Sequence, residues 1–271
     1  MKNKRVVIVT GASRGIGRAT ALKFAEEGCR LVLVDLEHGV LEAVARELTA
    51  LYNAECLICA GDLAEGDFLN AIAEQTVAKW GRVDVLINNA AWRTLETMRS
   101  ISRAVWEKTL MVCLTAPAFL SRQCAEVMER IQEGGVIVNV SSVMSARTGG
   151  SSPAYIAAKG ALDSLTYELA VTYGRSNIRV VGVQPGFIET ELSSDYLDPE
   201  GANISNTMTA EMIDMTPLAR GGTAAEIAAA IFWLSSESAA FISGTTLLID
   251  GGFKHNMNSY NIKKLQFPKE Y

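Results

Sequence analysis

Short apolar runs rich in β-branched residues alternate with amphipathic stretches along almost the whole chain, and no other feature constrains the fold as strongly. The runs occupy residues 5–10, 31–35, 56–60, 83–88, 136–140, 179–184 and 246–250. Strands and helices in alternation predict repeated βαβ units and a parallel sheet. Because the runs are apolar on both faces, we expect helices to cover both sides of that sheet.

Composition excludes several classes of protein. The 271 residues are 49% hydrophobic and include 22 glycines and 6 prolines, too apolar for a disordered chain and too poor in glycine and proline for a collagen. A net charge of −5 offers no basic surface for nucleic acid. No apolar run approaches the roughly 18 residues of a membrane helix. We therefore expect a cytoplasmic enzyme with a small-molecule substrate and neither nucleic-acid nor membrane partners.

The chain reads as one domain over residues 1–253, without a linker or an internal repeat beyond the βα alternation. The polar, methionine-rich stretch 191–222 is too long for an ordinary loop and is a candidate substrate lid. Residues 254–271 follow the last predicted strand as a tail. Such a tail can fray, but its apolar residues Tyr260, Ile262, Leu265 and Phe267 favour docking on a neighbouring subunit near its active site.

Local signals mark three helix ends. Ser152 followed by Pro153 predicts a helix that begins at the proline, with the serine as N-cap. Thr223 and Glu226 have the spacing of a capping box. Gly28 is a natural stop for the first helix.

The five cysteines favour a structural role. Cys56 and Cys59 form a C-x-x-C motif, which is found in redox and zinc sites. They lie in a strand-like run, however, where residues three apart point to opposite faces. No second cysteine pair follows, and the chain has only two histidines. We therefore predict buried strand cysteines, no metal, and the reducing compartment that unpaired cysteines suit.

A glycine-rich turn follows the first predicted strand. The sequence Thr10-Gly-Ala-Ser-Arg-Gly-Ile-Gly17 joins that strand to a helix. Glycines let the backbone approach a pyrophosphate, and the helix N-terminus supplies N–H donors and a positive dipole end. Since a glycine triplet alone is weak evidence, its position between strand and helix carries the prediction. The residues expected to bind a dinucleotide here are Gly11, Ser13, Arg14, Gly15, Ile16 and Gly17.

The end of the second strand indicates which dinucleotide binds. Asp35 stands roughly 20 residues beyond the glycine turn, where a carboxylate accepts hydrogen bonds from the adenosine ribose. The same carboxylate would repel a 2′-phosphate, so we predict NAD rather than NADP. Arg14 is evidence for NADP instead, because a basic residue in the turn can contact that phosphate. Further cofactor contacts are expected where the second, third and fourth strands end, at Leu36, Asp62, Leu63, Asn89 and Ala90.

Three polar residues near the fifth strand form a candidate catalytic group. Ser142 follows the strand, and Tyr155 and Lys159 lie four residues apart on the next predicted helix, and so on one face. A phenol ordinarily ionises near pH 10, but a nearby cation favours the phenolate. Tyr155 can then exchange a proton with an oxygen on the carbon that exchanges hydride. A Y-x-x-x-K pattern alone is common; its combination with Ser142, the glycine turn and Asp35 is not.

Together these motifs resemble the short-chain dehydrogenase/reductase family, in its NAD-preferring branch, over about residues 4–253. The resemblance rests on TGASRGIG, NNAA, YIAAK, QPGFIET, PLARGGTAAEIA and ISGTTLLIDGG. It implies a Rossmann-type, doubly wound, seven-stranded sheet and hydride transfer between NAD(H) and an alcohol or carbonyl carbon. It also implies a homo-oligomer, either a dimer or a tetramer.

Carried onto this chain, the resemblance gives roles to individual residues. Tyr155 becomes the acid/base, Lys159 binds the nicotinamide ribose and assists Tyr155, and Ser142 hydrogen-bonds the substrate oxygen. Four residues after the sixth strand would lie along the nicotinamide: Pro185, Gly186, Ile188 and Thr190.

The chain departs from the family pattern at two positions. NNAG reads NNAA here, which adds a methyl group at Ala91. Members typically carry an asparagine in the fourth helix, where it helps to hold a water of the proton relay; that position is Cys113 here. A thiol is a weak donor and a weak acceptor. We therefore predict a slowed or rerouted relay rather than a dead enzyme.

The substrate is less constrained. Candidate contacts are Trp92, Arg93, Met144, Arg147, Phe187 and Glu191, each of which could instead be packing or solvated. A mixture of aromatic and charged groups favours a sugar, a polyol or a similar hydroxylated compound, although methionines in the lid could line an apolar site. Two alternatives stay open: a 3-oxoacyl thioester reductase that uses NADPH, and a non-catalytic dinucleotide-binding protein.

Overall fold

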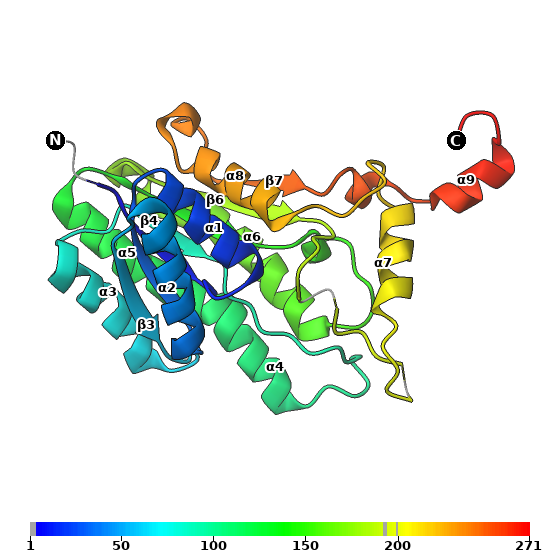
Figure 1. Ribbon diagram of the computed structural model, residues 1–271, viewed down its shortest axis with the longest axis horizontal. Coiled ribbons are helices and arrows are strands. Elements are labelled where there is room, and N and C mark those ends of the chain that lie inside the picture. Colours follow the sequence, from blue (N-terminus) through cyan, green and yellow to red (C-terminus); the bar gives the residue numbers. More distant parts are fainter. Residues whose placement is uncertain (1–3, 192–193, 199) are drawn as a thin grey trace.

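Seven parallel strands form one sheet in the order β3-β2-β1-β4-β5-β6-β7 (Figure 1). The computed structural model describes residues 4–191, 194–198 and 200–271. Every predicted strand is present, and each boundary lies within two residues of its expected position. The strands are β1 Val6–Thr10, β2 Arg30–Asp35, β3 Cys56–Ala60, β4 Val85–Asn88, β5 Gly135–Val140, β6 Ile178–Pro185 and β7 Thr245–Ile249.

Helices cover both faces of the sheet, as the apolar strands require. One layer contains α1 Gly15–Glu26, α2 His38–Tyr52 and α8 Ala224–Leu234. The other contains α3 Gly66–Trp80, α4 Arg103–Leu110, α5 Ala116–Ile131 and α6 Pro153–Tyr173. A π-helical turn, η1 Met111–Thr115, joins α4 to α5. The prediction of a doubly wound α/β fold is confirmed.

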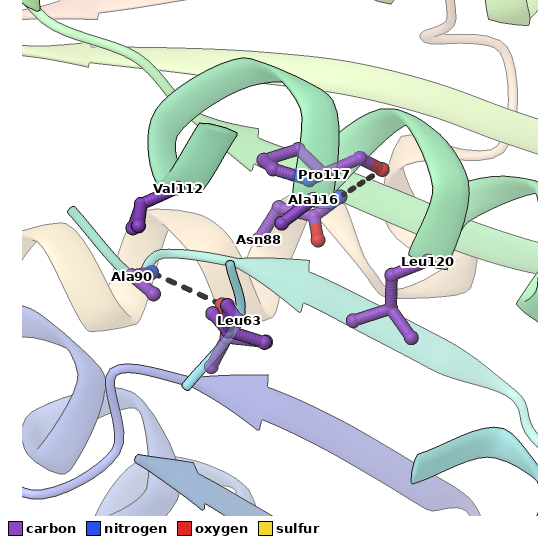
Figure 2. Close-up of a pocket in the computed structure, with 8 residues that line it drawn as sticks. Leu63, Asn88, Ala90, Val112, Ala116, Pro117 and Leu120 are labelled. Carbon is purple, nitrogen blue, oxygen red and sulfur yellow. Dashed lines mark hydrogen bonds between the residues drawn. The ribbon is translucent and has the colours of Figure 1, made fainter. Parts of the chain in front are cut away.

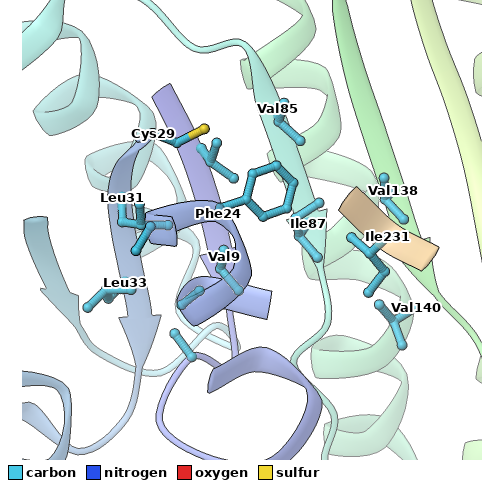
Figure 3. Packing of buried hydrophobic residues seen from close by; sticks show 14 of the residues in the cluster. Val9, Phe24, Cys29, Leu31, Leu33, Val85, Ile87, Val138, Val140 and Ile231 are labelled. Carbon is cyan, nitrogen blue, oxygen red and sulfur yellow. The ribbon is translucent and has the colours of Figure 1, made fainter. Parts of the chain in front are cut away.

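Alternating residues of the central strand feed the two cores. Val7 and Val9 of β1 pack beside Phe24 of α1, whose ring lies among side chains of β1, β2 and β4 (Figure 3). Val6 and Ile8 point to the opposite core, beneath α3 and α5. Because successive side chains of a strand point to opposite faces, one apolar run can supply both layers.

The order of the strands reverses beside β1. The chain moves outward from β1 to β2 and β3, and then returns to place β4 on the other side of β1. In open parallel sheets, ligands bind in the crevice at the carboxyl ends of the strands at such a switch point. The fold therefore puts the glycine turn after β1 and the NNAA segment after β4 at one place.

The three helix-end predictions have different outcomes. Gly28 has a φ of +75° just after α1, and the Thr223–Glu226 capping box is present in both directions, so these two are confirmed. Helix α6 begins at Pro153 as predicted, but Ser152 makes no side-chain cap. Its hydroxyl donates instead to the carbonyls of Thr94 and Ser151. The cap prediction is wrong, because the Ser152 side chain is directed toward these carbonyls and its oxygen accepts no N–H of the helix.

The candidate lid, residues 191–222, contains a helix, α7 Ser205–Asp214, which stands apart from the sheet (Figure 1). A short β-bridge joins the two ends of this segment. Glu189 N–H donates to Gly222 O, and Gly222 N–H donates to Phe187 O. Leu192, Ser193 and Pro199, which belong to the predicted lid, lie outside the described residues.

The tail contacts the end of α7 through Asn256 and through Asn261, whose N–H donates to Asp214 Oδ2 at 3.2 Å. Asn256 is buried, and its Nδ2 donates to Met215 O at the end of the lid, 2.7 Å away. Beyond it, the short helix α9 Tyr260–Gln266 projects from the body, with Leu265 81% exposed (Figure 1). Within the described ranges, none of the helices has the length and the apolar character that crossing a membrane requires.

The cysteines behave as structural residues. Cys56 and Cys59 lie in β3, and burial raises the pKa of each thiol to about 11, which keeps both protonated near neutral pH. Among residues 4–191, 194–198 and 200–271, no group of three or more His, Cys, Asp or Glu side chains could hold a metal ion.

Candidate active site

A single cleft of about 860 Å³ runs along the carboxyl ends of the strands. The predicted catalytic, cofactor and substrate residues all line it, except Gly17. The lid contributes one wall, and the loop between β5 and α6 contributes another. A volume of this size can enclose a sizeable organic ligand.

The glycine turn is shaped by close backbone approach. Gly11 and Gly15 have φ values of +66° and +50°, a region that favours glycine. Gly17 lies below the turn, and a Cβ there would collide with the carbonyl oxygen of Gly11. Gly17 therefore shapes the turn from beneath, while Gly11 and Gly15 line the cleft.

The NNAA segment braces this turn from β4. The Thr10 hydroxyl accepts hydrogen bonds from Asn89 N–H and Ala90 N–H, each at 3.0 Å. Asn89 Nδ2 donates to the carbonyls of Thr10 at 2.9 Å and Gly11 at 3.2 Å. Asn89 thus ties two strand ends together rather than closing a turn of its own.

No water molecule fits below the place where the NNAA segment meets the glycine turn. Leu63, Ala90 and Val112 line a space that has no room for a water molecule (Figure 2). Beneath it, buried Asn88 donates to Asn139 Oδ1 on β5 and to Ser121 Oγ on α5. These bonds fix β4 relative to its neighbours, and so fix the base of the cleft.

Asp35 is held firmly at the end of β2. Its carboxylate accepts from Ser13 N–H at 3.0 Å and from Leu36 N–H at 2.7 Å. Arg14, whose guanidinium could have served a 2′-phosphate, is paired with Glu37 at 3.1 Å. Two carboxylates therefore stand at this end of the cleft, and the charge of the one nearby arginine is compensated.

The residues around the glycine turn fit a nicotinamide dinucleotide. Ser13 Oγ is buried and has no hydrogen-bond partner within the described part of the chain, so it is available to a phosphate oxygen. The turn leaves no space for a Cβ at Gly11 or Gly17, and α1 begins at Gly15 and presents its N-terminus there. Gly11, Ser13 and Gly15 would hold the pyrophosphate, and Asp35 the adenosine ribose.

The three candidate catalytic residues all line the cleft. Tyr155 and Lys159 share one face of α6, with Lys159 Nζ 5.5 Å from the centre of the tyrosine ring. Lys159 is buried, and its ammonium donates to Val140 O at 2.6 Å, at the end of β5. Ser142 also lines the cleft, and its Oγ accepts from Met144 N–H at 3.1 Å. Strand β5 and helix α6 thus hold all three from a rigid base.

The lid is anchored to the loop that follows β4. The Arg93 side chain is 7% exposed, and its guanidinium pairs with Asp195 of the lid at 3.0 Å. The same guanidinium lies 5.7 Å from the centre of the Tyr196 ring. Beside it, the Trp92 ring packs against the ammonium of Lys108. Arg93 therefore spans the cleft to the lid and is not a solvated surface charge.

A second set of contacts joins the lid to the chain after β7. The Arg147 guanidinium stacks on the Phe253 ring at 4.1 Å and donates to Phe253 O. It also donates to Met215 Sδ at 3.8 Å. Met144 and Phe187 line the same wall.

Sequence reasoning missed several residues that line the cleft: Glu37, Lys108, Asp195, Tyr196, Glu211 and Phe253. They come from segments with no motif of their own. Phe253 was the only one with a local signal, because it directly follows Gly251 and Gly252, which have φ values of +61° and +89° and turn the chain back toward the cleft.

Cys113 is fully buried in the π-helical turn η1. Its thiol donates to Trp92 O and accepts from Trp92 N–H, both at 3.4 Å. The sulfur is thus engaged with the loop after β4, and Cys113 does not line the cleft.

Comparisons with known proteins agree with this geometry. A family model described as "Enoyl-(Acyl carrier protein) reductase" matches residues 11–254. Levodione reductase of Leifsonia aquatica is 36% identical over 253 residues, which are 92% of this chain and 93% of the relative. The chain belongs to the short-chain dehydrogenase/reductase family.

Two further members show how broad the similarity is. The cis-4-hydroxycyclohexanecarboxylate dehydrogenase of Sinomonas cyclohexanicum is 34% identical over 92% of this chain and 96% of its own length. The crystal structure of L-sorbose reductase from Gluconobacter frateurii, complexed with NADPH and L-sorbose, has a TM-score of 0.86 and 28% identity. That likeness covers 93% of this chain and 97% of the reductase. This short-chain dehydrogenase/reductase is thus an oxidoreductase of CH–OH groups that uses a nicotinamide dinucleotide.

Proposed function

We propose that this protein is an NAD(H)-dependent dehydrogenase that interconverts an alcohol, most often a secondary one, and the corresponding ketone or aldehyde of a sugar, a polyol or a similar small hydroxylated compound. The presence of Tyr155, Lys159 and Ser142 in one cleft carries this proposal. The relatives named levodione reductase, cis-4-hydroxycyclohexanecarboxylate dehydrogenase and L-sorbose reductase support a small substrate.

The chain's own residues can perform the proton transfer. The cofactor, when bound, supplies the nicotinamide ring that accepts or donates the hydride. Ser142 Oγ hydrogen-bonds the substrate oxygen and orients it. The Tyr155 phenolate oxygen accepts the hydroxyl proton as the carbon becomes a carbonyl, and returns it in the reverse direction. The buried Lys159 ammonium stabilises the negative charge on that oxygen.

The charges at the adenosine end support NAD as the cofactor. A 2′-phosphate would lie close to the carboxylates of Asp35 and Glu37, and Arg14 is already paired. The NADPH in the L-sorbose reductase complex belongs to that enzyme. Here two hydrogen bonds from backbone N–H groups hold the Asp35 carboxylate in place, which favours the unphosphorylated ribose.

A second candidate is the reduction of 3-oxoacyl thioesters with NADPH, because the matching family model is described as an acyl carrier protein reductase. The acidic adenosine end opposes it. We place the alcohol dehydrogenase first for this reason.

The test is NAD reduction, followed by near-ultraviolet absorbance, with pooled sugars, polyols, hydroxy acids and secondary alcohols. A second series of assays uses NADP in place of NAD. A third series follows the oxidation of NADPH by acetoacetyl thioesters. We expect signal with NAD and one of the alcohol pools. Turnover restricted to the thioester series with NADPH would reject the proposal in favour of the second candidate.

A further inference from the structure

The loop between β5 and α6 carries a charge that the proposed reaction does not use. Five cationic side chains line the cleft. Arg14, Arg93 and Lys108 pair with the carboxylates of Glu37, Asp195 and Asp62, and Lys159, which donates to Val140 O, takes part in the proposed reaction. Arg147 has no role in that reaction, and no carboxylate of the described residues lies within 4 Å of it. Its contacts are a carbonyl and a thioether sulfur.

Arg147 is held in place although its charge is not compensated. The Phe253 ring supports one face of the guanidinium, and Phe253 O and Met215 Sδ fix two of its nitrogen atoms. A guanidinium has five N–H donors, so several remain for a ligand. Support of this kind lowers the entropy cost of forming a two-pronged hydrogen bond.

The surroundings strengthen an interaction with an anion. Arg147 contacts the Phe253 ring and the Met215 thioether, and further apolar side chains, Met144, Met212 and Phe187, line the same cleft. Charges attract more strongly where water is excluded. Ser142 lies five residues before Arg147, and Tyr155 lies eight residues after it, in the first turn of α6. The cleft therefore contains both the groups that handle a hydroxyl and a group suited to an acid.

From these contacts we infer that Arg147 binds a carboxylate of the substrate, which makes the substrate a hydroxycarboxylic acid. The inference rests on the proposed function and narrows its substrate class. A planar carboxylate matches the fork of a guanidinium. Glu191 and Glu211 also line the cleft, and their carboxylates would repel a phosphate dianion more strongly than a carboxylate, which carries one negative charge.

Kinetics on matched substrates test this inference. A pool of sugar acids and cyclic hydroxycarboxylic acids is compared with the pool of their methyl esters, with NAD, in the full-length protein. The wild type is expected to prefer the acids at least about tenfold in kcat/KM. Arg147→Met, which keeps an apolar stem against Phe253, should lower kcat/KM for the acid at least about 30-fold, as expected when one partner of a buried charged pair is removed. The same variant should leave the ester nearly unchanged.

Two further variants separate charge from structure. Arg147→Lys keeps the charge without the fork and should recover part of the loss. Arg46→Met removes an exposed arginine of α2 that does not line the cleft, and it should leave turnover of both acid and ester unchanged. Phosphorylated and sulfonated alcohols, offered beside the acids, show whether another anion is preferred, and such a preference would reject the carboxylate.

The contrary results are distinct. Equal losses on acid and ester in Arg147→Met would show that Arg147 only holds Phe253 and the lid, and an ester preference in the wild type would also reject the inference. In both cases the proposed dehydrogenase would stand. Silence with every pool, while NAD binding persists, would overturn the proposed function itself and the inference with it.

Discussion

The two ends of the cleft are built in different ways. At the cofactor end, backbone groups dominate: the glycine turn, the N-terminus of α1, and an Asp35 carboxylate held by two N–H groups. At the substrate end, side chains dominate, and they come from separate segments of the chain that meet only in the folded protein. The contrast indicates that cofactor binding is encoded in local motifs, whereas specificity arises from long-range contacts such as Arg93–Asp195 and Arg147–Phe253.

The largest effect is expected where the two ends meet. Tyr155→Phe removes the oxygen that exchanges a proton with the substrate, so turnover should fall by roughly a hundredfold to ten-thousandfold. The phenylalanine fills the same space, so the NAD dissociation constant, measured by calorimetry, should stay close to that of the wild type. Ser142→Ala serves as the companion variant. Full turnover in Tyr155→Phe would remove the tyrosine from the mechanism.

The next effect breaks the cofactor end alone. In Gly17→Ala, the new methyl group would collide with the carbonyl oxygen of Gly11, and relieving such overpacking typically costs about 1–3 kcal/mol. NAD should therefore bind about ten- to a hundredfold more weakly. Gly39→Ala is the matched control, because nothing lies within 4 Å of a Cβ at that position of α2. It should leave NAD affinity unchanged; equal behaviour of the two variants would contradict the packing argument.

A smaller effect sharpens the choice of cofactor. Asp35→Ser removes the carboxylate that faces the adenosine ribose, and we expect the ratio of NAD to NADP affinity to fall by about tenfold, the equivalent of about 1.4 kcal/mol. Fluorescence titration with NADH and NADPH measures both affinities. Glu37→Gln, which removes the more exposed acid and releases Arg14, should move the ratio in the same direction but less. An unchanged ratio in Asp35→Ser would show that the carboxylate does not select the cofactor.

The smallest effect concerns the proton relay. Cys113→Asn restores the residue that family members typically carry, and we expect turnover to change by no more than about tenfold, together with a shift of its pH profile. Because Cys113 is buried against Trp92, thermal unfolding must be measured alongside. Identical turnover and an identical pH profile would show that the relay does not depend on this position.

The sequence could place the residues of the cofactor end at one edge of the sheet, because the information for that end is local. Each strand is one apolar run, and Asp35 and Asn89 follow directly from where those runs end. The common face of Tyr155 and Lys159 was equally predictable, since residues four apart lie on one face of a helix. The predicted site residues therefore line the cleft almost without exception.

The substrate end could be predicted only as a set of candidates. Whether Arg93 was solvated or paired depended on Asp195, a hundred residues away in a lid with no repeating pattern. Glu211 had no local signal and Phe253 had only the two glycines before it, because only the packing of α7 and of the chain after β7 brings them to the cleft. The Ser152 cap was wrongly predicted for the same reason, since the hydroxyl group donates a hydrogen bond to the carbonyl of Thr94, which is distant in sequence.

Direct observation of hydride transfer tests the central claim. Once a pool gives a signal, its active alcohol is prepared with deuterium on the carbon that bears the hydroxyl group, and the NADH formed is analysed by mass spectrometry. We predict one deuterium atom per NADH with the wild-type protein and no labelled NADH above background with Tyr155→Phe. Unlabelled NADH from the wild type, or equal labelling by both proteins, would contradict an alcohol dehydrogenase that works through Tyr155.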